Sequence, residues 1–168
     1  LFIQPAYSGS GEKPSVDKQT YDVIIAVEKL NAGNKHAQAL NRLERFIPTL
    51  QAESYDKAIS LKLLAYTYLQ QESVPEAIRA FEQAIEAKGL PGEQRLDIRR
   101  QVANLYLSEE QYAKSLGHIM LVLEGGVDIR PEDHVMAGYA LVQQERYTEA
   151  RGHVETAVTL ADTPKISW

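Results

Sequence analysis

One pattern of apolar and small residues occurs four times along this chain. It starts at Val23, Leu61, Arg99 and His134, at intervals of 38, 38 and 35 residues. Such a period is typical of a helical hairpin that is repeated, because one hairpin cannot bury its apolar side alone. The seven positions of the pattern are Val23, Ala26, Val27, Leu30, Ala39, Leu43 and Phe46; Leu61, Leu64, Ala65, Tyr68, Ala77, Phe81 and Ala84; Arg99, Val102, Ala103, Tyr106, Ser115, Ile119 and Val122; His134, Ala137, Gly138, Leu141, Ala150, Val154 and Ala157.

The second copy, residues 61–89, shows the two helices of the hairpin most clearly. Its apolar residues recur three and four positions apart in two stretches, which predicts two amphipathic helices. Between these stretches Ser73 precedes Glu76 by three residues, a spacing that predicts a capping box at the start of the second helix. Lys88 and Gly89 are expected to end that helix.

The pattern closely resembles the tetratricopeptide repeat, abbreviated TPR. The resemblance implies an all-α fold, a right-handed superhelix of about four helix-turn-helix units. We expect these units at residues 20–53, 58–91, 96–129 and 131–164, with a fifth begun at 165–168, inside a single array over residues 16–168. Three departures from the family pattern are Arg99 and His134 at a position that usually holds a large apolar side chain, and Pro48 late in a helix.

Composition excludes several classes of function. The net charge of -5 argues against nucleic acid as the main partner, because binding phosphates requires a basic surface. The chain has no cysteine, so thiolate metal sites and disulfides are excluded. No apolar run reaches the length needed to span a membrane, and we expect no membrane insertion.

The four histidines and one acidic cluster have side chains that could carry chemistry. None of the four histidines stands in a HExxH, GxSxG or similar motif, so we predict a protein that is not an enzyme. The cluster Asp128, Glu132, Asp133 and His134 has the composition of a metal site. We interpret Glu132 and Asp133 instead as acids at the start of a helix opened by Pro131. No metal and no cofactor is predicted.

In TPR proteins, partners usually bind the concave surface lined by the first helix of each unit. Counting from the pattern, this resemblance assigns seven residues to a partner-binding groove, which are Tyr21, Glu28, Lys62, Tyr66, Arg100, Asn104 and Tyr139. Arg100 and Asn104 are similar in spacing to part of the carboxylate clamp of some TPR proteins. Because aromatic and arginine side chains dominate binding hot spots, the predicted centre is Tyr66, Arg100, Asn104 and Tyr139. A solvated groove of mixed charge is the alternative.

Residues 1–15 form a separate segment. Leu1 to Ser8 looks like the end of a secretory signal peptide, with small residues at Ala6 and Ser8, and residues 9–15 have the composition of a linker. An unrelated apolar tail is the alternative. Together with the divergent repeats, this start resembles exported bacterial TPR proteins that accompany TonB/ExbB/ExbD systems. That resemblance implies a periplasmic location, with a cytoplasmic one as the alternative.

The leading interpretation is a protein-protein interaction scaffold that binds a peptide or protein segment. The second helix of the fourth unit is expected to expose an apolar face, supplied by Ala150, Val154, Ala157, Val158 and Leu160. A further unit of a longer chain would cover this face, or two molecules would associate through it. The alternative function is therefore an accessory or oligomerisation module of a longer protein, which could be catalytic.

Overall fold

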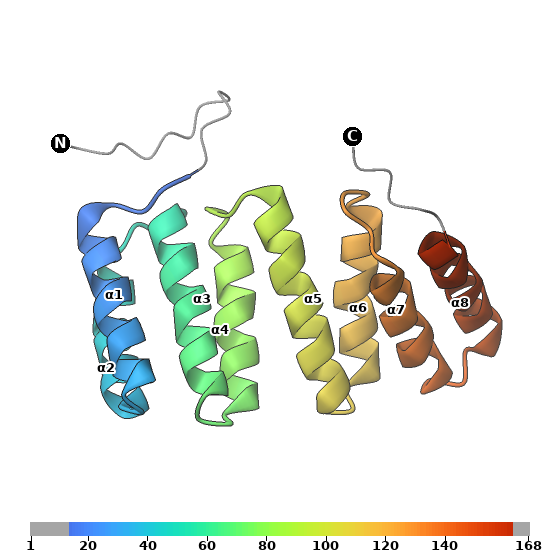
Figure 1. Cartoon of the computed structure of the whole chain (residues 1–168), viewed down its shortest axis with the longest axis horizontal. Helices are drawn as coiled ribbons and strands as arrows, with labels where there is room; N and C mark the ends of the chain where they lie inside the picture. The colour runs from blue at the N-terminus through green and yellow to red at the C-terminus, as the bar shows by residue number, and fades with distance from the viewer. Residues whose placement is uncertain (1–13, 163–168) are drawn as a thin grey trace. The chain divides into compact units, whose positions relative to one another are not determined.

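The computed structural model describes residues 14–162, and these residues are helical apart from short connections (Figure 1). The chain divides into two compact units, residues 1–92 and residues 93–168, and each is described by itself. No strand occurs in the described range. The predicted signal-peptide remnant at 1–8 and the fifth repeat at 165–168 lie outside the described residues.

The N-terminal unit contains two helical hairpins. The first pairs α1 (Lys18–Ala32) with α2 (His36–Phe46), which is followed by the 3₁₀ turn η1 (Ile47–Thr49). The second pairs α3 (Tyr55–Leu69) with α4 (Val74–Glu86). Helix α3 also packs against α1 and α2, so the second hairpin stacks on the first.

The C-terminal unit repeats this arrangement. Its helices are α5 (Gly92–Ser108), α6 (Tyr112–Glu124), α7 (Pro131–Val142) and α8 (Tyr147–Asp162). Helix α7 packs against both α6 and α8. Buried side chains from α5, α6, α7 and α8 form one hydrophobic cluster, whose members include Ala103, Ile119, Ala137, Leu141 and Ala150.

Most positions of the repeated pattern are buried, as the predicted register requires. In the second repeat Leu61, Leu64, Ala65, Ala77, Phe81 and Ala84 are all buried. In the fourth repeat His134 is half-buried, and Val154 on α8 is 50% exposed. Ala150 and Ala157 on the same helix are buried, whereas Val158 is also exposed. The predicted apolar face of α8 is therefore present. Its two valines are exposed, whereas its two alanines are buried.

The turn inside each repeat is the same in all four copies. The residue four positions after the fourth pattern position adopts a positive φ, and the next N–H donates to the carbonyl of that fourth position. These left-handed residues are Asn34, Glu72, Glu110 and Glu145, with φ from 56 to 60°. The closing hydrogen bonds run from Lys35 to Leu30, Ser73 to Tyr68, Gln111 to Tyr106 and Arg146 to Leu141, at 2.8 to 3.0 Å. This is the Schellman geometry that ends a helix.

This turn explains why the predicted capping box is wrong. The Ser73 N–H is bound to the Tyr68 carbonyl, and Ser73 takes ψ 68° rather than the extended conformation that a capping serine needs. Its hydroxyl makes no capping bond to α4 and lies 3.5 Å from the Gln71 carbonyl instead. Helix α4 still starts at Val74, directly after Ser73, as predicted.

Two further expectations about helix ends change in detail. Lys88, rather than Gly89, takes the left-handed conformation after α4. Gly89 is needed for a different reason, because a Cβ atom there would lie 2.2 Å from the Ser54 carbonyl oxygen. Pro48 does not lie inside an α-helix, since α2 ends at Phe46 and Pro48 belongs to the short 3₁₀ helix η1.

Two histidines join α7 to α8. The Nδ1 atoms of His134 and His153 are 3.0 Å apart, a hydrogen-bonding distance. Burial and the neighbouring His134 ring lower the pKa of His153 below its ordinary value. One ring donates its Nδ1 proton to the Nδ1 atom of the other, so the two helices share one hydrogen bond.

The core packing of Phe81 gives the first prediction. Phe81 is fully buried and contacts the ring of Tyr66 edge to face. We expect Phe81→Ala to lower the free energy of unfolding by about 3 to 5 kcal/mol, because it leaves a cavity. Denaturant titration followed by circular dichroism measures the loss. A loss below about 1 kcal/mol would contradict this packing.

The shared turn gives the second prediction. Glu145 is exposed and left-handed, so we expect Glu145→Gly to raise the free energy of unfolding by about 0.5 to 1 kcal/mol. The matched control is Gln143→Gly, since Gln143 is exposed but has φ -65°. This control should lower stability in the same titration. Equal effects of the two glycines would show that the turn geometry is not responsible.

Candidate partner-binding face

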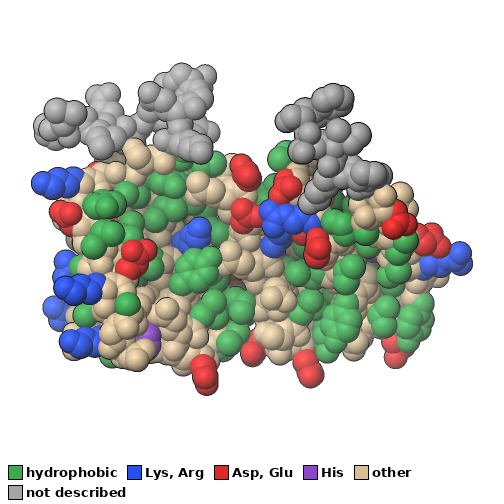
Figure 2. Space-filling model, viewed as in Figure 1, with side chains coloured by type: hydrophobic (Ala, Val, Ile, Leu, Met, Phe, Trp, Pro, Cys, Tyr) green, Lys and Arg blue, Asp and Glu red, His purple; other side chains and the backbone are tan. Residues whose placement is uncertain are grey.

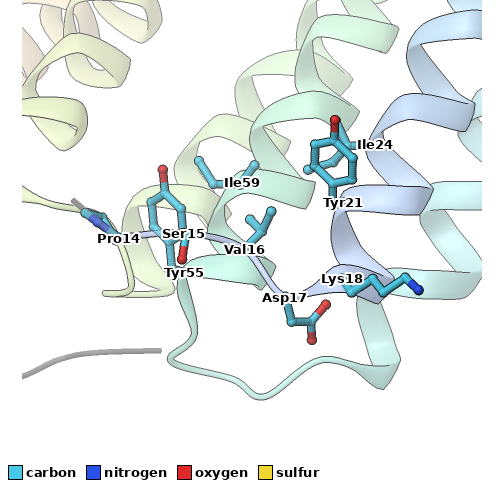
Figure 3. A pocket seen from close by; sticks show the side chains of 9 residues that line it. All are labelled: Pro14, Ser15, Val16, Asp17, Lys18, Tyr21, Ile24, Tyr55 and Ile59. Atoms are coloured by element: carbon cyan, nitrogen blue, oxygen red, sulfur yellow. The ribbon is translucent and has the colours of Figure 1, made fainter. Parts of the chain in front are cut away.

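An apolar pocket of about 630 Å³ opens on the N-terminal unit (Figure 3). Tyr21 and Ile24 reach it from α1, and Tyr55 and Ile59 reach it from α3. Val16 lies between the two helices. The remaining residues of its wall are Pro14, Ser15, Asp17 and Lys18. In the surface view, hydrophobic side chains gather over the first turns of α1 and α3 (Figure 2).

The segment before α1 is fixed to α3 by hydrogen bonds. The Asp17 N–H donates to Asp56 Oδ1 at 2.9 Å, and Asp56 is buried in the first turn of α3. The Asp17 carboxylate accepts the Thr20 N–H at 2.6 Å and thereby caps α1. These bonds hold one wall of the pocket in place while its apolar side chains stay accessible.

Further along α3, an aromatic ring and a cation lie together on the surface. Tyr66 packs edge to face on Phe81, with 5.2 Å between ring centroids and 88° between ring planes. The Lys62 Nζ lies 5.9 Å from the Tyr66 ring centroid. Because Phe81 is fully buried, it holds the Tyr66 ring in one orientation at the surface.

The predicted groove residues of the N-terminal unit therefore have different surroundings. Among the four predicted residues of this unit, only Tyr21 lines the pocket. Its side chain is 56% exposed. Glu28 is exposed on α1, outside the pocket wall. Lys62 and Tyr66 form the pair on α3. The sequence pattern did not single out Tyr55, which comes from the start of α3 rather than from a counted position.

In the C-terminal unit, Arg100 is buried and bound to several oxygens. Its Nε and Nη2 donate to the two carboxylate oxygens of Asp133, at 2.8 and 3.0 Å. Nη1 donates to Asp97 at 2.9 Å, and Nη2 also reaches the Asp128 carbonyl at 2.7 Å. Hydrogen bonding to Asp133 raises the pKa of Arg100 above its ordinary value. The guanidinium group thus joins α5 to the start of α7.

The other two predicted residues of this unit are exposed. Asn104 lies on α5, one turn after Arg100. Tyr139 on α7 is 49% exposed and contacts Tyr112 of α6, with ring centroids 6.3 Å apart. Binding of a partner by any of the seven residues stays a prediction.

Asp133 stabilises the start of α7, as the sequence suggested, and it also binds Arg100. It accepts the Arg130 N–H at 2.9 Å, just before α7 begins. The Arg100 contact was missed because the two residues are far apart in sequence and a surface position was inferred for Arg100.

The remaining histidines lie in structural contacts. His36 Nδ1 is 3.3 Å from Asn31 Oδ1, and the His118 ring packs beside Tyr106. Over residues 14–162, no three or more potential ligands gather to hold a metal ion. In the same range, no helix combines the length and the apolar character needed to cross a membrane.

The ion pair between Arg100 and Asp133 gives the third prediction. Both side chains are buried, so removing one leaves an unpaired buried charge. We expect Asp133→Ala to lower the free energy of unfolding by about 3 to 5 kcal/mol.

The control for this prediction is Asp97→Ala, because Asp97 binds the same arginine from the surface. It should cost less than about 1 kcal/mol. In the Arg100→Ala, Asp133→Ala double variant, the loss should be smaller than the sum of the two single losses. Additive losses would show that the two side chains do not stabilise each other.

The chain is similar in structure to known repeat proteins. No protein-family model matches it, and no curated protein does. A Podosopora anserina protein with nearly identical TPR-like repeats, assigned as a kinesin light chain, is 20% identical. It matches with a TM-score of 0.65 over 88% of this chain and 78% of its own.

Two other solved structures give the same result. MamA is 15% identical, with a TM-score of 0.66 over 85% of this chain and 78% of its own. BtubC from P. vanneervenii is 14% identical, with a TM-score of 0.67 over 89% of this chain and 68% of its own. At these identities the likeness concerns the fold, and with the helical hairpins described above it shows an all-α, TPR-like repeat fold.

Proposed function

We propose that this protein is a non-catalytic scaffold that binds a peptide or protein segment on the face formed by α1 and α3. The observation that carries the proposal is the apolar pocket between Tyr21, Ile24, Tyr55 and Ile59. Large apolar side chains that remain exposed in a concave site are typical of binding surfaces. Both helices pack against neighbouring helices, which supports the side of the pocket that they form.

The Lys62 and Tyr66 pair extends this surface along α3. A fixed aromatic ring with a neighbouring cation can contact both apolar and polar groups of a bound chain. Lys62 forms no salt bridge among the described residues. We therefore keep Tyr21, Glu28, Lys62 and Tyr66 as the proposed binding residues of the N-terminal unit.

In the C-terminal unit the proposed binding residues are Asn104, Tyr139 and Arg100. Asn104 and Tyr139 are exposed and available for contact. Arg100 differs because its donors are already bound to Asp133, Asp97 and the Asp128 carbonyl. A binding effect of an Arg100 variant must therefore be compared with its effect on stability.

The fourth prediction tests the binding face. A partner is first selected from a peptide display library on the immobilised chain. We expect Tyr21→Ala and Tyr66→Ala each to weaken its binding at least about tenfold, since aromatic side chains dominate such interfaces. Fluorescence anisotropy with the labelled peptide measures the affinity.

The control for this experiment is Tyr147→Ala. Tyr147 is 63% exposed at the start of α8, outside the proposed binding residues. This variant should bind as the unmodified chain does. If the two α1 and α3 variants also bind with unchanged affinity, the face formed by α1 and α3 is not the site.

We also propose that the scaffold works in the periplasm, beside components of a TonB/ExbB/ExbD system. The support for this is the resemblance of residues 1–8 to the end of a signal peptide. Cell fractionation of the native protein tests it. Recovery in the cytoplasmic fraction would overturn the location and, with it, the TonB role.

The second candidate function is an oligomerisation or accessory module of a longer protein. The observation that favours it is the exposed apolar face of α8, where Val154 and Val158 are 50% and 56% exposed. Light scattering over a range of concentrations tests self-association. A mass that grows with concentration, and returns to the monomer value in Val154→Asp, would support it.

A further inference from the structure

The histidine pair between α7 and α8 lies outside the proposed binding residues. His134 and His153 face each other, with 3.0 Å between their Nδ1 atoms and 5.2 Å between their ring centroids. Their planes are inclined by 40°. Both residues are half-buried, so solvent reaches the pair. Neutral imidazole nitrogens are also common metal ligands.

The close approach of α7 and α8 fixes the separation of these rings. Gly138 lies one turn after His134, and a Cβ atom there would be 3.3 Å from the Val154 side chain. It would also lie 3.5 Å from the Ala150 carbonyl and 3.7 Å from the His153 Cβ. Glycine at this position therefore lets α8 come near enough for its histidine to reach His134.

The ring spacing matches the requirement of a tetrahedral metal ion. Two imidazole nitrogens bound to one ion at about 2.0 to 2.1 Å lie roughly 3.3 Å apart, with ring centroids roughly 5.2 Å apart. The observed centroid distance is 5.2 Å. Turning the rings is enough to open the nitrogen separation from 3.0 Å, and the χ2 torsion of histidine is soft. The helices need not move.

We propose that His134 and His153 form a binding site for a divalent transition-metal ion of the Zn²⁺ class. The ion replaces the hydrogen bond between the rings. The ring that carries its proton on Nδ1 shifts it to Nε2, which leaves a lone pair on both Nδ1 atoms. Water completes the coordination, because the described structure supplies two protein ligands.

Charged side chains of both signs lie on the two helices that carry the pair. Glu149 lies one turn before His153 on α8, and Glu132 is exposed near the start of α7. The Glu149 carboxylate is bound by the Arg146 guanidinium group through two bonds of 2.7 Å, which largely compensate its charge and occupy its oxygens. Imidazole nitrogens favour Zn²⁺ and related ions, whereas Mg²⁺ and Ca²⁺ prefer oxygen ligands. The site is therefore selective against the hard ions.

Calorimetric titration of the chelator-treated, tag-free chain with Zn²⁺ tests the proposal. We expect one ion per chain, and binding weakened at least tenfold in His134→Gln and in His153→Gln. His36→Gln is the matched control and should bind as the unmodified chain does. Mg²⁺ should give no binding. Unchanged Zn²⁺ affinity in both pair variants would overturn the proposal.

Two further measurements guard against a folding effect of these substitutions. Gly138→Ala keeps both histidines and adds a Cβ atom 3.3 Å from the Val154 side chain, where α7 meets α8. The neighbouring atoms must shift by a few tenths of an ångström, so this variant should weaken Zn²⁺ binding while the chain stays folded. In the unmodified chain, nuclear magnetic resonance of the imidazole nitrogens should show that Zn²⁺ shifts Nδ1 of His134 and His153. Shifts at other histidines alone would place the ion elsewhere and overturn the proposal.

Discussion

The close contact between the two helices of each hairpin is the constraint on which the rest of this structure depends. It requires small residues where the helices cross, and Ala65, Ala103 and Gly138 fill this position in three successive repeats. Larger side chains such as Phe81 and Ile119 then fill the space beside the crossing and are fully buried. A larger residue at the crossing would separate the helices and leave the space around these side chains unfilled.

Because this contact follows from residue size and spacing, much of the fold could be predicted from the sequence. The register of the repeats and the burial of Phe81 depend on period and side-chain volume, which are visible in the amino-acid string. The capping box at Ser73 was predicted wrongly for a local reason. Its pattern was correct, but the backbone of the preceding turn uses the Ser73 N–H and holds the residue outside the capping conformation.

The candidate site was predicted less well, since its properties depend on contacts between distant residues. Counting along the helix placed Tyr21 on the binding face, where it lines the pocket. The same counting gave Arg100 an outward position, yet Asp133, 33 residues later, binds it in the interior. The distance between His134 and His153 could not be predicted from the sequence either, because it depends on how α7 and α8 cross. Periodicity describes one helix at a time and carries no information about such pairs.

The four identical turns have a consequence for how the chain folds. Each is closed by a hydrogen bond between residues five positions apart, such as Arg146 and Leu141, so the entropy lost in closing it is small. The two helices of a hairpin can therefore meet early, before contacts with the next hairpin form. Most native contacts in such a chain link neighbours in sequence, and a topology of this kind folds rapidly.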